Sequence, residues 1–79
     1  MFEMTIKSVL HVRNVFAVAG ECIGRNELKP GILKDETGRE YKYFIPIGKR
    51  YDFDDNKIDI QLLEESLNIN DLVGMKLIQ

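Results

Sequence analysis

The sequence contains little cysteine and no long apolar run. Its single cysteine, Cys22, cannot form a disulfide within the chain, which excludes the small disulfide-rich folds of secreted proteins. The longest uninterrupted apolar run covers residues 15–19, far fewer than the roughly 20 residues that a membrane-spanning helix requires. Residues 1–4 carry neither the basic segment nor the apolar stretch of a secretory signal peptide. These absences predict a cytoplasmic protein without a membrane partner.

The sequence also lacks an excess of charge of either sign. It has 11 Lys and Arg residues against 13 Asp and Glu residues, which gives a formal net charge of −2 and an isoelectric point near 5.3. Domains that bind nucleic acid strongly usually have an isoelectric point above about 9, so bulk attraction to phosphate is not predicted. A chain of 79 residues buries about 60% of its surface on folding, which is enough for one core. We therefore predict a single domain over residues 1–79.

Residues for catalysis or zinc binding are scarce. A single histidine, His11, and the single cysteine cannot supply the four ligands of a structural zinc site. A thiol–imidazole pair requires both side chains to lie on one face. Strand alternation places His11 on the outward face with Arg13, and Cys22 on the core face with Phe16. We therefore expect Cys22 to be a small core residue and the protein not to be an enzyme.

A short motif at residues 56–59 matches the NKxD pattern with which GTPases recognise guanine. That motif works beside a P-loop that holds the phosphates, and the sequence contains no GxxxxGK[ST] segment. Ile58 also belongs to an alternating series with Ile60 and Leu62, as in a strand. The motif is therefore predicted to be a loop that runs into a strand, with no nucleotide bound.

An acidic cluster of Asp52, Asp54 and Asp55 resembles the start of a calcium-binding loop. Such a loop requires glycine at its sixth position and glutamate at its twelfth. Counted from Asp52, these positions hold Lys57 and Leu63. No metal and no cofactor are therefore predicted, and the cluster is interpreted as part of a solvated loop.

Alternation of apolar and polar residues predicts a strand over residues 2–12. Its apolar residues occupy even positions, including Leu10 and Val12, which are expected to face the core. Ser8 and Val9 each break the alternation, which indicates a bulge. A second strand is predicted over residues 15–25, with Phe16 and Val18 in the core. Two glycines inside it, at positions 20 and 24, are typical of sharp corners in a barrel.

Turn residues and further alternation divide the rest of the chain. A turn at residues 36–38 predicts a hairpin between residues 32–33 and the β-prone residues 41–47, within which Pro46 is expected at an edge. Residues 58–62 and 73–78 alternate as two further strands, and residues 62–72 are expected to contain one short helical turn. The predicted fold is all-β: a small closed or partly open antiparallel β-barrel of about six strands.

Four phrases resemble the second, β-barrel domain of translation GTPases such as elongation factor Tu. Residues 15–20 are similar to that domain's "VF.I.G", residues 24–25 to its "GR", residues 28–31 to its "LK.G", and residues 70–77 to its "GDNVGLLL". The chain departs from the family at Ile32, where the family usually has aspartate, and across residues 48–57. The resemblance implies a stand-alone barrel of this type, and a partner such as ribosomal RNA or a translation component.

Cations beside aromatic residues in the loop at residues 48–57 suggest a contact surface, because this pairing binds single-stranded nucleic acid by stacking. The predicted function is a non-catalytic binding module that contacts RNA, the ribosome or a translation component. The alternative is a protein-interaction or regulatory module that uses the barrel only as a scaffold. The residues predicted to bind RNA or a protein partner are Arg13, Arg25, Lys49, Arg50, Tyr51 and Phe53.

Overall fold

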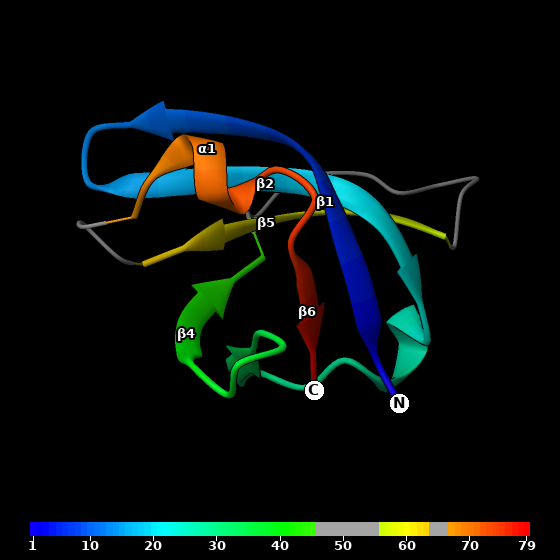
Figure 1. Cartoon of the computed structure of the whole chain (residues 1–79). Helices are drawn as coiled ribbons and strands as arrows, with labels where there is room; N and C mark the ends of the chain where they lie inside the picture. The colour runs from blue at the N-terminus through cyan, green and yellow to red at the C-terminus, as the bar shows by residue number, and fades with distance from the viewer. Residues whose placement is uncertain (46–55, 64–66) are drawn as a thin grey trace.

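The computed structural model describes residues 1–45, 56–63 and 67–79. Six antiparallel strands form a closed barrel in the order β1-β2-β5-β4-β3-β6, which confirms the predicted all-β barrel (Figure 1). A 3₁₀ helix, η1 (Arg25–Glu27), and a short helix, α1 (Ile69–Leu72), complete the described elements. The strands are β1 (Glu3–Val12), β2 (Val15–Ile23), β3 (Gly31–Lys34), β4 (Glu40–Phe44), β5 (Lys57–Leu62) and β6 (Lys76–Ile78).

A bulge divides β1 into two halves that bury opposite positions. Even residues up to Ile6 are buried, as predicted. The pairing with β2 shifts between Ile6 and Ser8, which confirms the predicted bulge. The extra residue reverses the alternation, so Val9 packs against the core whereas Leu10 and Val12 are exposed. The prediction that Leu10 and Val12 face the core is therefore wrong.

Two glycines permit the close approach of β2 to the start of the chain. A Cβ atom on Gly20 would lie 1.8 Å from the carbonyl oxygen of Thr5, so no larger residue fits without moving β1. Gly24 precedes η1 with φ 73°, and a Cβ atom there would lie 2.2 Å from the carbonyl oxygen of Met1. Both glycines therefore stand at a tight corner of the barrel, as the sequence predicted.

The hairpin of β3 and β4 forms as predicted, with Leu33 opposite Tyr41. Gly38 lies in its turn with φ 91°, a conformation that favours glycine. Pro46, predicted at an edge, is outside the described residues.

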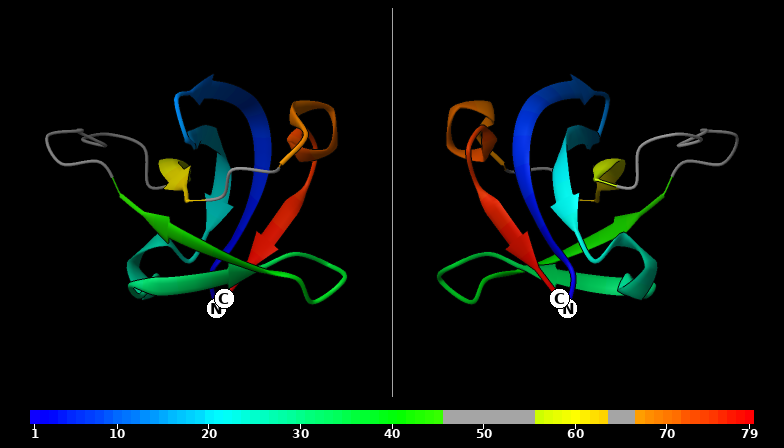
Figure 2. Two further views of the ribbon diagram at one scale, coloured as in Figure 1. Left: turned by 90° about the vertical axis from the view of Figure 1, so that its left-hand side faces the viewer. Right: turned by 90° about the vertical axis from the view of Figure 1, so that its right-hand side faces the viewer.

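Helix α1 and β6 close the barrel beside β1. The predicted helical turn is confirmed, and the Asn68 side chain accepts a hydrogen bond from the Asn70 backbone N–H at its start. Figure 2 shows β6 running from α1 alongside the first half of β1. The strand predicted from residue 73 begins only at Lys76, and Val73 is exposed. Helix α1 occupies the preceding residues and places Leu72 in the core.

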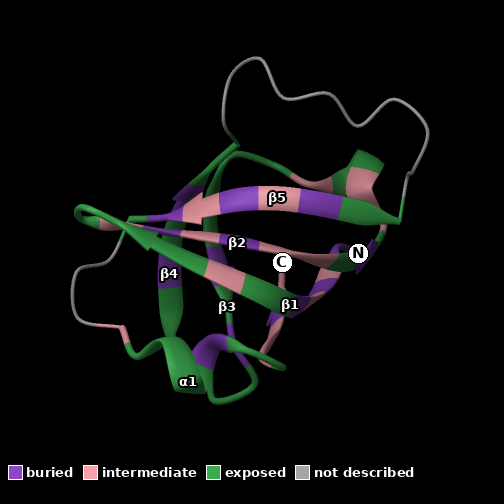
Figure 3. Ribbon diagram, turned by 90° about the horizontal axis from the view of Figure 1, so that it is seen from above, coloured by how far each residue is buried: buried purple, intermediate pink, exposed green. Residues whose placement is uncertain are grey.

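The core fills the inside of the barrel, and buried and less buried residues alternate along the strands (Figure 3). Cys22 lies in this core, as predicted. Within the described parts of the chain, no helix has the length and apolar character needed to span a bilayer. The buried apolar residues are Phe2, Met4, Ile6, Phe16, Val18, Cys22, Leu33, Tyr41, Tyr43, Ile58, Ile60, Leu62, Leu72 and Leu77.

Candidate functional site

The two predicted contact residues that the structure describes lie far apart. Arg13 occupies the turn between β1 and β2, whereas Arg25 lies in η1 after β2. Figure 1 shows this turn and the turquoise η1 at opposite ends of the molecule. The nine residues of β2 separate them, a strand about 30 Å long. Arg13 and Arg25 therefore do not form one contact surface.

The other four predicted contact residues are outside the described residues. Their roles in binding RNA or a protein stay predictions, as does the interpretation of the acidic cluster that begins at Asp52. These four residues are Lys49, Arg50, Tyr51 and Phe53.

His11 lies on a different face from the one predicted. It is paired with Phe16, and the two rings stack with centroids 4.2 Å apart. The bulge in β1 reverses the alternation and so moves His11 to the core side of the strand, although its side chain stays exposed at the end of the barrel. Cys22 is paired with Met4, six positions further along β2 and about 20 Å away. The two side chains are therefore too far apart for a catalytic pair.

The NKxD motif runs into a strand, as predicted. The carbonyl oxygen of Asn56 accepts a hydrogen bond of 2.7 Å from the backbone N–H of Cys22. Lys57 and Asp59 then pair with Glu21 and Ala19 as part of β5. The motif therefore forms part of the β2–β5 ladder. Across residues 1–45, 56–63 and 67–79, no cluster of three or more His, Cys, Asp or Glu side chains is placed to hold a metal ion.

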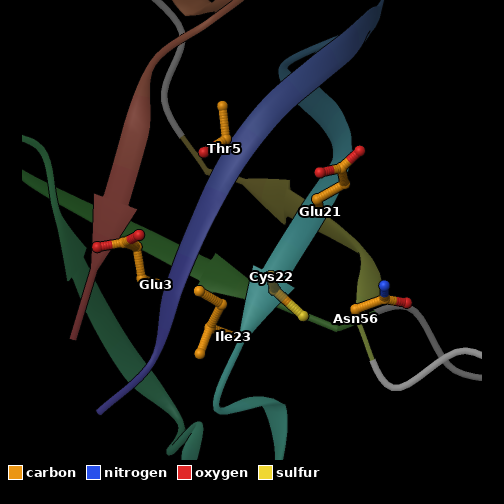
Figure 4. A pocket seen from close by; sticks show the side chains of 6 residues that line it. All are labelled: Glu3, Thr5, Glu21, Cys22, Ile23 and Asn56. Atoms are coloured by element: carbon orange, nitrogen blue, oxygen red, sulfur yellow. The ribbon is translucent and has the colours of Figure 1, made fainter.

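A hollow of about 220 Å³ lies over the first half of β1 (Figure 4). Two carboxylates line it, but Figure 4 shows Glu3 and Glu21 on opposite sides of the β1 ribbon. The Glu3 carboxylate also lies 4.0 Å from the Lys76 amino group. The acids therefore do not converge on a common point. The lining residues are Glu3, Thr5, Glu21, Cys22, Ile23 and Asn56.

A row of outward side chains crosses four strands of the barrel wall. Leu10 is paired with Ala17 across β1 and β2, and Ala17 is paired with Gln61 on β5. Gln61 is paired in turn with Phe44 on β4. Directly opposite residues project to the same side of a sheet. This row is exposed at both ends, with Leu10 63% and Phe44 42% accessible to solvent.

A second outward row lies beside the first, towards the β1–β2 turn. Val12 is paired with Val15 at the end of the hairpin. Leu63 follows β5 and donates a backbone hydrogen bond of 2.9 Å to the carbonyl oxygen of Lys42 on β4. Val12 and Leu63 are both exposed. Together the two rows form an outer apolar face, defined by Leu10, Val12, Val15, Ala17, Phe44 and Leu63 around Gln61.

The charges around the outer apolar face are unevenly placed. Arg13 and Lys42 are exposed on the side of the β1–β2 turn. Asp59 lies on the other side, in the outward row of Ser8 and Ala19. Exposed cations therefore stand on the side of the face that is nearer the β1–β2 turn.

This face could not be recognised from the sequence because its members come from four separate segments. Leu10 and Val12 were predicted to face the core because they continue the even-numbered apolar series, but the bulge reverses the alternation after Ile6. One local signal was present, since apolar residues occupy both odd and even positions from Val9 to Val12. A strand with apolar residues on both faces has one face exposed unless a partner covers it.

Comparisons of the chain with protein-family models, curated proteins and solved structures find no match. The resemblance to the barrel of translation GTPases therefore stays a prediction from the sequence.

Proposed function

We propose that this chain is a non-catalytic binding module that recognises a protein partner through its outer apolar face. The observation that carries the proposal is that four large apolar side chains, Leu10, Val12, Phe44 and Leu63, are exposed on adjoining rows of the barrel wall. Contiguous exposed apolar surface rimmed by charge is characteristic of protein-interaction sites. The closed barrel supports this role by holding the face on a rigid wall.

A protein partner is favoured over RNA by the nature of this surface. RNA contacts require cations that follow a phosphate chain, whereas Arg13 and Arg25 are separated by the length of β2. The face itself is apolar and carries exposed cations on one side. The resemblance of the sequence to a translation-factor barrel supports a partner among the translation components.

Affinity capture from the source cells tests the proposal. The wild-type protein is compared with the double variant Leu10→Ser and Phe44→Ser, and bound proteins are identified by mass spectrometry. Both side chains are exposed, so the substitutions are expected to keep the fold. The matched control is Ile23→Ser, because Ile23 is 70% exposed on β2 but lies outside the outer apolar face. A protein partner that is lost only with the double variant supports the proposal.

Salt separates this outcome from RNA binding. Phosphate contacts give a steep loss of affinity as salt rises, whereas an apolar protein contact changes little. Capture of ribosomal RNA that is lost with rising salt and kept by the double variant would overturn the proposal.

A further inference from the structure

We infer that an extended segment of the partner protein, with an apolar middle and an acidic residue at each end, binds as an added strand along the open edge of β1. This open edge is the side of residues 7–12 that faces away from β2. The inference rests on the proposed function and specifies the form in which the partner binds.

The second half of β1 has a neighbouring strand on one side only. β6 pairs with residues 3–5, and Ile6 exchanges backbone hydrogen bonds of 2.9 and 2.8 Å with Met75 and Gly74. Among the described residues, the part of β1 that follows pairs with β2 alone. Figures 1 and 2 show this part at the top of the molecule, with no described element above it. The barrel therefore closes through the first half of β1 and leaves an edge along the second half.

Two residues direct their backbone groups away from β2 along this edge. Val12 and Val15 flank a two-residue turn, and so they form the hydrogen-bonded pair that closes the hairpin. Hydrogen-bonded and non-hydrogen-bonded pairs alternate along an antiparallel ladder. The N–H and C=O groups of Val9 and His11 therefore point outward. In the part of the chain that the structure describes, neither residue makes a backbone hydrogen bond outside its strand. Outward backbone groups of this kind are a template for a further strand.

The open edge lacks the features that usually protect strand edges. Monomeric proteins block such edges with charged residues, proline or a bulge. The bulge and Lys7 stand where the open edge begins, but residues 8–12 contain no lysine, arginine, acid or proline. Leu10 and Val12 are also exposed there. By contrast, β4 carries Glu40 and Lys42 where it extends beyond its pairs with β5. We therefore expect a partner to cover the open edge of β1.

The charges at the two ends of the open edge define the ends of the partner segment. Lys7 and Arg13 are both exposed, and neither makes an ion pair among the described residues. They stand about 20 Å apart along the strand. A segment of about seven extended residues spans this distance. A carboxylate at each end then reaches one cation, and the middle residues pack beside Leu10 and Val12.

The same charges disfavour a second copy of the chain as the occupant. Two copies that pair through Val9 and His11 place the Lys7 of each opposite the Arg13 of the other. Like charges directly opposite each other destabilise a strand pair. A segment with acidic ends meets attraction at both places instead.

A designed peptide and NMR test the inference. The peptide is about seven residues long, and valine alternates with threonine between two terminal glutamates, with valine next to each glutamate. We expect a Kd on the order of 100 μM. At about ten times that concentration, hydrogen exchange at the Val9 and His11 amides is expected to slow about tenfold. The Leu10 amide is the internal reference, because it already bonds to β2.

Backbone methylation of the peptide distinguishes an added strand from contact through side chains alone. Alternate residues of a strand direct their N–H groups to the same neighbour. Valines beside Leu10 and Val12 leave the threonine N–H groups to bond with Val9 and His11. We therefore expect N-methylation of the threonines to weaken binding at least about tenfold. N-methylation of the valines, the matched control, is expected to change the Kd less than about twofold.

A proline variant of the protein tests the same ladder from the other side. His11→Pro removes an N–H that does not bond to β2, a position where strands accept proline. His11→Ala is the reference, because it also loses the stacking on Phe16 but keeps the N–H. Relative to His11→Ala, we expect His11→Pro to bind the peptide at least about tenfold more weakly.

A charge reversal tests the acidic ends. A peptide with lysine in place of both glutamates is expected to bind the wild type about fivefold more weakly. Lys7→Glu with Arg13→Glu is expected to reverse this preference. The matched control is Lys29→Glu with Lys34→Glu, which makes the same change in net charge away from the open edge. This control is expected to keep the wild-type preference.

The outcomes separate the inference from the proposed function. Equal binding of the two methylated peptides, or no peptide binding at all, would overturn the added strand. A captured partner that is lost with Leu10→Ser and Phe44→Ser but kept by His11→Pro would overturn the inference and leave the proposed function standing. A wild-type dimer in sedimentation equilibrium that His11→Pro abolishes would overturn the inference in favour of a second copy of the chain.

Discussion

Asp35 shows how one side chain organises the turn between β3 and β4. Its Oδ1 accepts hydrogen bonds from the Thr37 backbone N–H at 2.8 Å, the Thr37 hydroxyl at 2.6 Å and the Arg39 backbone N–H at 3.0 Å. Its Oδ2 accepts from the buried Tyr41 hydroxyl at 2.8 Å. The Thr37 hydroxyl makes the largest contribution to lowering the pKa of Asp35 from 3.8 to about 2, although burial opposes the shift.

The stabilisation from Asp35 is therefore expected to depend on pH. A carboxylate with a lowered folded pKa stabilises the protein above its unfolded pKa of 3.8, and this contribution is lost as the pH falls towards 2. At pH 7 we expect Asp35→Asn to lower the free energy of unfolding by about 2 kcal/mol. Urea denaturation of both proteins from pH 7 to pH 2 measures the difference, and Thr37→Val is the control that removes one donor. A difference that stays constant down to pH 2 would contradict this account.

Arg13 adopts a positive φ in the two-residue turn between β1 and β2, a position where glycine is unstrained. Glycine relieves the strain of its positive φ, so Arg13→Gly is expected to raise the free energy of unfolding by about 1 kcal/mol. For a domain of this size, that change raises the melting temperature by about 4–8 °C. The neighbouring Asn14→Gly is the control, because Asn14 has no positive φ and loses stability on replacement by glycine. An Arg13→Gly variant that melts below the wild type would show that the turn is not strained.

At the scale of elements, the packing of β2 against β1 requires that position 20 carry no side chain, which only glycine provides. Gly20→Ala places a Cβ atom 1.8 Å from the Thr5 carbonyl oxygen, so we expect a loss of more than about 3 kcal/mol in the free energy of unfolding. Gly74→Ala is the matched control, because Gly74 has φ 88° but open space around a Cβ atom. Its expected cost is about 1–2 kcal/mol, from backbone strain alone. Thermal denaturation followed by circular dichroism distinguishes the two, and equal costs would refute the close approach.

The strands could be predicted from the sequence where the alternation is local and uninterrupted. Residues 58–62 alternate without a break, and β5 covers Lys57–Leu62 with Ile58 and Ile60 buried. In β1 the bulge was predicted, but its effect on Leu10 and Val12 was not. One extra residue reverses the side to which all later side chains point. The sequence shows where an alternation breaks. Which of the later side chains point into the core depends on how the strand pairs with its partner.

At the scale of the whole molecule, the outer apolar face could not be predicted from any one segment. Ala17 and Gln61 become neighbours only because β2 pairs with β5, and Phe44 joins them because β5 also pairs with β4. This order places sequence-distant strands side by side, and a chain read one segment at a time does not reveal it. The prediction of contact residues was based on where cations occur along the chain. It therefore grouped Arg13 with Arg25, although β2 separates them in the structure.

The weakest described seam of the barrel lies between β3 and β6, which pair at Lys34 and Ile78. The Gln79 side chain bridges this seam, because its Oε1 accepts from the Lys29 backbone N–H at 2.7 Å. Its Nε2 donates to the carbonyl oxygens of Lys29 at 2.7 Å and Ile32 at 3.2 Å. The Tyr43 hydroxyl donates to the same Lys29 carbonyl oxygen. One side-chain amide therefore supplies the contacts that a longer strand pairing would make.

We expect closure of the barrel beside Lys29 to depend on the Gln79 side-chain amide. Gln79→Ala removes three hydrogen bonds and is expected to lower the free energy of unfolding by about 1–2 kcal/mol, since each is partly replaced by water. It should also speed hydrogen exchange at the Lys29 amide, which loses its acceptor. Gln79→Glu is the matched control, because a carboxylate still accepts from the Lys29 backbone N–H but cannot donate to the carbonyl oxygens of Lys29 and Ile32. Native-state hydrogen exchange by NMR should therefore show Lys29 protected in the wild type and Gln79→Glu and unprotected in Gln79→Ala. Equal protection in all three proteins would mean that the β3–β6 seam closes without the Gln79 side chain.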